Sequence, residues 1–101
     1  TAGGLAVADY FSPFNQAALD SSDLDIASAG PTLLPDSAGT AAHPHLLVAS
    51  GKDGTIYLLD RDNMGHYNGS YTSADSRIVQ WIPNAIGILV NDPKASPLPY
   101  V

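Results

Sequence analysis

The stretch HLLVASGKDGTIYLLD, residues 45–60, decides the fold class. It holds two apolar runs, 45–50 and 55–60, separated by Gly51-Lys52-Asp53-Gly54, a composition typical of a turn. Two such runs around a Gly-containing loop predict a β-hairpin in which Lys52 and Asp53 are turn formers. The runs are almost continuously apolar, so we expect both strands to be covered on both faces.

Further strand candidates lie on either side of this hairpin. A short apolar run at 32–34 is bounded by two prolines, and a second run at 78–82 precedes Pro83. A fifth candidate covers 86–90, the segments between the runs are turn-rich, and no helix is clearly indicated. Short strands joined by Gly and Pro turns predict an all-β fold: a sandwich, a barrel or a propeller.

Composition limits the classes of partner. The 101 residues carry a net charge of −6, which disfavours binding to nucleic acid and to anionic membranes. Cysteine is absent, which excludes disulfides, thiol catalysis and cysteine-based zinc sites. No apolar run approaches the roughly 20 residues of a membrane-spanning helix.

Residues 43–61 resemble the central hairpin of a blade in β-propellers of the quinoprotein (PQQ-like) repeat type. In that family a strand ends at a Gly-Lys-Asp-Gly turn, and the next strand reads hydrophobic-Tyr-hydrophobic-Leu-Asp, here ending at Asp60. A glycine follows, matched by Gly65 with one residue more than the usual spacing. The segment 23–34 is similar to the acidic stretch that opens a blade. The family's docking Trp is missing from its usual place, and Trp81 is the nearest Trp.

The resemblance implies an antiparallel four-stranded blade-like sheet from an incomplete propeller. Residues 20–83 would form the blade, 1–19 an irregular flanking segment, and 84–101 the start of the next blade or an extended tail. A single blade has two apolar faces that need neighbours. The implied partners are therefore other blades, from the same chain, another chain or further copies in a homo-oligomer. The implied location is periplasmic or extracellular.

Two functions follow from the resemblance. The first is a non-catalytic scaffold or protein-interaction surface in an exported protein. The alternative is a fragment of a PQQ-dependent alcohol or sugar dehydrogenase, with PQQ and calcium as cofactors. In that case the cofactor residues lie outside this chain, because the family's adjacent Cys pair is absent and its Glu and Arg contacts have no matching positions. Nothing singles out Trp81 for stacking on a quinone.

A third function comes from the acidic loop. Asp20, Asp23 and Asp25 offer oxygen ligands of the kind Ca²⁺ prefers, as in a calcium-stabilised adhesion module. The chain has no Glu and no complete Asp-x-Asp-x-Asp-Gly pattern. The competing interpretation is that these side chains cap turns.

Other polar motifs are weaker. His43 and His45, with His66 as a third ligand, form a poor pattern for zinc or copper. No Gly-x-Ser-x-Gly elbow indicates a catalytic serine. Asn68-Gly69-Ser70 is an N-glycosylation sequon in a predicted loop, relevant only in a secreted eukaryotic protein. The aromatic residues are predicted to pack in the interior (Tyr10, Phe11, Phe14, Tyr57 and Trp81).

Overall fold

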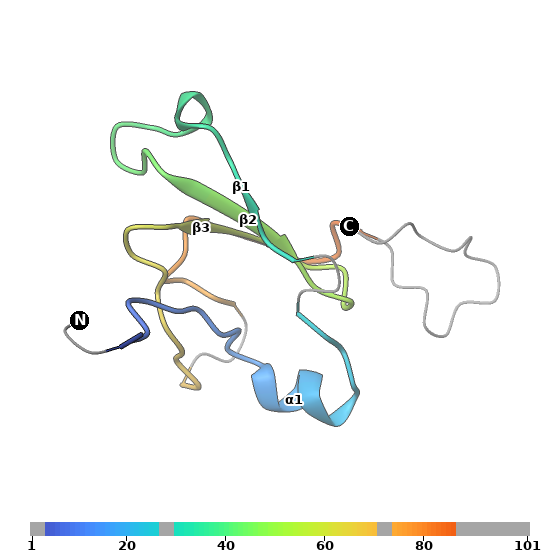
Figure 1. Cartoon of the computed structure of the whole chain (residues 1–101). Helices are drawn as coiled ribbons and strands as arrows, with labels where there is room; N and C mark the ends of the chain where they lie inside the picture. The colour runs from blue at the N-terminus through green and yellow to red at the C-terminus, as the bar shows by residue number, and fades with distance from the viewer. Residues whose placement is uncertain (1–3, 27–29, 71–73, 87–101) are drawn as a thin grey trace.

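The computed structural model describes residues 4–26, 30–70 and 74–86, which form one open antiparallel sheet with little helix (Figure 1). Its four strands follow chain order, β1-β2-β3-β4, and every neighbouring pair is antiparallel. The all-β prediction is thus confirmed at the level of an open four-stranded sheet. The elements are α1 (Gln16–Ser21), β1 (Thr32–Leu33), the 3₁₀ turn η1 (Asp36–Ala38), β2 (Leu46–Ser50), β3 (Ile56–Asp60) and β4 (Gln80–Ile82).

The predicted hairpin is present as β2 and β3, with Leu46 opposite Asp60 and Ser50 opposite Ile56. The N–H of Gly51 donates to the carbonyl of Thr55 at 3.0 Å, which closes a three-residue loop. Gly54 ends this loop with φ of +85°, a left-handed conformation that suits glycine. Turn chemistry therefore fixes the register of the two central strands.

The outer strands are shorter than the sequence predicts. β1 ends at Leu33, although the N–H of Leu34 still donates to the carbonyl of Leu46 at 3.0 Å. Pro35 has no N–H and cannot continue the ladder. β4 begins at Gln80 rather than at residue 78. Of the fifth candidate, 86–90, all but its first residue lies outside the described residues.

The helix α1 corrects the prediction of an irregular first segment without helix. This short helix begins with four good helix formers, Gln16, Ala17, Ala18 and Leu19. It buries only Leu19. Six residues are too few to show a helical period in the sequence, and for that reason the pattern missed it.

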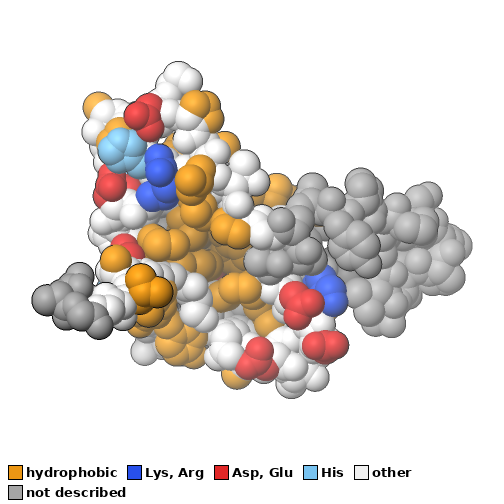
Figure 2. Space-filling model, in the orientation of Figure 1, with side chains coloured by type: hydrophobic (Ala, Val, Ile, Leu, Met, Phe, Trp, Pro, Cys, Tyr) orange, Lys and Arg blue, Asp and Glu red, His pale blue; other side chains and the backbone are white. Residues whose placement is uncertain are grey.

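The core lies on one face of the sheet. Leu47, Tyr57 and Leu59 are buried there, and partly buried side chains pack against them (Phe11, Met64, Ile78 and Trp81). The Phe11 ring lies 5.3 Å from that of Tyr57, and Phe14 meets Trp81 edge-on at 6.2 Å. Hydrophobic side chains gather near the centre of the view in Figure 2, with acidic side chains around them. Phe11, Phe14, Tyr57 and Trp81 therefore pack as predicted, whereas the prediction was wrong for Tyr10, whose side chain is 48% exposed.

Residues 9–14, called here the N-terminal strap, cover that core. The carboxylate of Asp9 accepts the Met64 N–H at 2.9 Å and lies 2.7 Å from His66 Nε2. The rings of Tyr10 and His66 stack at 4.5 Å. Bonds from the Met64 and Tyr10 N–H groups, followed by the bond with His66, lower the pKa of Asp9. The strap is thus fixed by polar and stacking contacts at the surface and by the contact of Phe11 with Tyr57 in the core.

Candidate functional site

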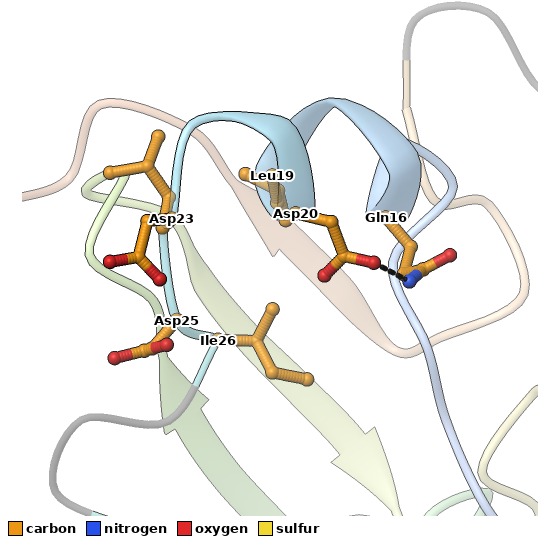
Figure 3. A pocket seen from close by; sticks show the side chains of 7 residues that line it. Gln16, Leu19, Asp20, Asp23, Asp25 and Ile26 are labelled. Atoms are coloured by element: carbon orange, nitrogen blue, oxygen red, sulfur yellow. Dashed lines mark hydrogen bonds between the residues drawn. The ribbon is translucent and has the colours of Figure 1, made fainter.

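A pocket of about 460 Å³ opens beside α1, and the three predicted calcium ligands line it (Figure 3). Asp20, Asp23 and Asp25 share it with Gln16 and with apolar side chains (Leu19, Leu24 and Ile26). The loop that follows α1 brings them together. The sequence therefore identified residues that are neighbours in space.

The three carboxylates do not converge on one point. Asp20 accepts a hydrogen bond from Gln16 Nε2, whereas Asp23 and Asp25 point to another side of the loop (Figure 3). Asp25 is paired with Lys52 Nζ at 3.1 Å. Within the described ranges no group of three or more His, Cys, Asp or Glu side chains could hold a metal ion. This donor set does not fit calcium, which takes six to eight oxygen ligands.

A second polar cluster lies where β2 begins and β3 ends. His43 Nδ1 is 2.7 Å from Asp60 Oδ2, and His45 Nδ1 is 2.7 Å from an oxygen of Asp62. Both pairs lie at the open end of the hairpin, where Leu46 is opposite Asp60 and the segments before β2 and after β3 come close together. The sequence reasoning missed these pairs, although two His and two Asp with the same spacing flank the hairpin.

Each of the three histidines is paired with a carboxylate. His66 lies apart from the other two and contacts Asp9 and Tyr10. In the part of the chain that the structure describes, no serine or threonine hydroxyl bonds a histidine ring, so no nucleophile–base pair is formed. The arrangement ties the entrance of β2 to the exit of β3.

Asp60 gives the fold a predictable response to acid. Its pKa is lowered, first by the bond with His43 and then by the Asp62 N–H, which donates to Oδ1 at 2.8 Å. A carboxyl group with a lowered pKa stabilises the fold above its unfolded value, 3.8, and this contribution disappears as the pH falls through the folded value. We expect Asp60→Asn to lower the urea midpoint at pH 7 and to match the parent at the lowest pH.

The control for this prediction is Asp62→Asn. That side chain is 61% exposed, and its pairing with His45 should contribute little. Urea unfolding followed by circular dichroism across pH 2–7 compares the three proteins. Equal midpoints for Asp60→Asn and Asp62→Asn at pH 7 would contradict the assignment.

The pKa of Asp75 is shifted in the direction opposite to that of Asp60. It is 7% exposed, its Oδ1 accepts the Phe14 N–H at 2.8 Å, and its Oδ2 has no partner among the described residues. Burial raises its pKa. A raised pKa means that the neutral form is favoured, so the contribution of Asp75 is fully present below 3.8 and is lost as the pH rises through the folded value.

The Asp75→Asn variant tests this assignment. Asparagine keeps a carbonyl for the Phe14 N–H and removes the buried charge, so we expect a higher urea midpoint than the parent at pH 7. The advantage should vanish below pH 3.8, where the parent carboxyl is neutral as well. A gain that persists unchanged in acid would show that charge is not its cause.

Comparison with known proteins adds no relative: no family model, curated protein or solved structure matches this chain. None of the described helices is long and apolar enough to cross a membrane.

Proposed function

We propose that this chain is a blade-like segment of a quinoprotein-type β-propeller, acting without catalysis as a scaffold or interaction surface in an exported protein. The observation that carries the proposal is the sheet order β1-β2-β3-β4, with all neighbours antiparallel and consecutive in the chain. Propeller blades are four-stranded sheets of this kind. The blade bounds, 20–83, include all four strands.

The faces of the sheet support an assembly role. Alternation along the strands places Leu47, Tyr57 and Leu59 on the face beneath the strap. Their neighbours in the chain belong to the other face, where four apolar side chains are half-buried (Val48, Ile56, Leu58 and Ile82). A sheet with apolar residues on both faces is suited to stacking between two layers.

The edge strands of the sheet, β1 and β4, also support an assembly role. β1 has two residues and β4 has three, so each outer strand offers few free backbone groups. Short edge strands discourage uncontrolled strand pairing. Face-to-face packing, rather than strand addition, is therefore the mode of association that we propose.

The dehydrogenase alternative finds less support. PQQ would need a free aromatic face, but Phe14 packs against Trp81 at 6.2 Å and Trp81 lies opposite Tyr57 in the sheet. Trp81 is partly buried against the core, and this packing disfavours a quinone-stacking role. The calcium-stabilised module predicts a melting temperature that falls when a chelator is added, because a ligand that binds only the folded state raises stability.

Two measurements test the proposal. The first is the intact mass of the natural polypeptide, where a value several times 10.5 kDa indicates a complete propeller. The second compares Val48→Lys, on the apolar face opposite the strap, with Ala17→Lys, an exposed residue of α1 outside the sheet. In the natural assembly we expect Val48→Lys to weaken association and Ala17→Lys to leave it unchanged. A natural 10.5 kDa polypeptide that remains monomeric would overturn the proposal.

A further inference from the structure

The turn at Asn68-Gly69-Ser70 has a geometry with chemical consequences. The Ser70 N–H donates to Asn68 Oδ1 at 3.0 Å. This side-chain turn folds the carboxamide of Asn68 back over its own following backbone. The carboxamide carbon can close a five-membered ring with the Gly69 nitrogen, and its carbonyl is polarised by the Ser70 N–H.

Glycine at position 69 leaves the backbone nitrogen without an adjacent Cβ, so a neighbouring group can approach it closely. A Cβ there would lie 2.5 Å from the Tyr67 hydroxyl oxygen. No residue that the structure describes accepts a hydrogen bond from the Gly69 N–H. Both properties favour attack by this nitrogen.

The other described asparagines are arranged differently. In each case the following N–H is already bonded: Gln16 after Asn15 donates to Pro13, Met64 after Asn63 donates to Asp9, and Ala85 after Asn84 donates to Gly54. A nitrogen whose hydrogen is held by an acceptor cannot readily lose it and turn towards the preceding side chain. The fold therefore shields three asparagines and leaves Asn68 unshielded.

We propose that Asn68–Gly69 is a site of spontaneous modification at which the asparagine is converted to isoaspartate and aspartate. The Gly69 nitrogen loses its proton and forms a bond to Cγ of Asn68. The C–N bond of the carboxamide breaks and ammonia leaves, which gives a cyclic succinimide. One water molecule then opens the ring at either carbonyl, yielding isoaspartate or aspartate without any oxidant or reductant.

This modification changes both charge and connectivity. It adds one negative charge to a chain of net charge −6, and the isoaspartate form routes the backbone through the side chain. It also destroys the glycosylation sequon, so a glycan on Asn68 and the succinimide route exclude each other. The same loop contains Met64 and His66, which hold the strap. Conversion at Asn68 therefore changes the loop whose contacts with Asp9 hold the strap over the core.

Peptide mapping tests the proposal with an internal control. Trypsin releases residues 62–77, a peptide that contains both Asn63 and Asn68. The unglycosylated chain is incubated folded at pH 7.4 and 37 °C, and fragment spectra locate the converted residue. We expect Asn68 to react at least about tenfold faster than Asn63, a barrier difference of about 1.4 kcal/mol. Equal rates, or conversion without isoaspartate, would overturn the succinimide route.

Two further experiments distinguish the effect of the Asn-Gly sequence from the effect of the folded structure on the rate of conversion. Gly69→Ala should slow conversion at Asn68, because a Cβ obstructs the nitrogen; an unchanged rate would contradict the route. In urea the shielded N–H groups are released, so the preference for Asn68 over Asn15, Asn63 and Asn84 should shrink. A preference of the same size in urea would show that the fold contributes nothing, and would overturn the structural part of the inference.

Discussion

Tyr57→Ala is expected to lower the free energy of unfolding by about 3–5 kcal/mol, the range found when large buried aromatic side chains are truncated. Tyr57 is a residue of β3, is 2% exposed, and its ring contacts Phe11 of the strap. Marginal stability is normal for a domain of this size, so a loss of this magnitude leaves much of the chain unfolded. Thermal and urea unfolding of the variant measure the loss directly.

The matched control is Tyr67→Ala, which removes the same side chain from a position that is 44% exposed. Surface substitutions of this kind usually change stability by less than about 0.5 kcal/mol. Comparable losses for the two variants would show that Tyr57 is not the centre of the core.

An alkaline titration provides an independent check on Tyr57. Burial, followed by the charges of Asp53 and Asp75, raises the pKa of its phenol well above the ordinary value of 10.0. The neutral form is favoured in the fold, so this stabilisation is present below pH 10.0 and is lost as the pH rises through the folded value. Absorbance should show that the Tyr57 phenol ionises only when the chain unfolds.

Local patterns in the sequence were sufficient to predict the sheet. The two apolar runs and the Gly51–Gly54 loop located β2 and β3 to within one residue, because turn chemistry and apolar runs are properties of neighbouring residues. The packing role of Phe11 and Phe14 was also predicted, although their partners were not. Turns and strands that depend on a few neighbouring residues can therefore be predicted from the sequence alone.

The remaining features depend on contacts between distant residues. Asp9 meets the Met64 N–H 55 positions away, and Phe14 bonds Asp75 61 positions away. No periodicity indicates such pairs, so the strap was missed. The hairpin register brings the segment before β2 close to the end of β3, but it places Leu46 opposite Asp60 and does not specify the His43–Asp60 contact.

Gly54→Val is expected to cost about 2–3 kcal/mol, more than any single Asp substitution, because a β-branched residue is forced into a left-handed conformation. The φ of Gly54 is +85°, and the residue is buried. Its N–H donates to the carbonyl of Gly51, and its own carbonyl accepts the N–H groups of Ala85 and Ile86. One residue thus closes the hairpin and anchors the chain after β4.

Gly4→Val is the control for added bulk, since Gly4 is exposed and a Cβ there meets nothing within 4 Å. Gly54→Ala separates the two sources of the loss, because alanine imposes the unfavourable φ without the β-branch. We expect the urea midpoint to be highest for Gly4→Val, lower for Gly54→Ala and lowest for Gly54→Val. A Gly54→Val protein as stable as Gly4→Val would mean that the loop can close by another route, and the register of β2 against β3 would have to be set by side-chain packing alone.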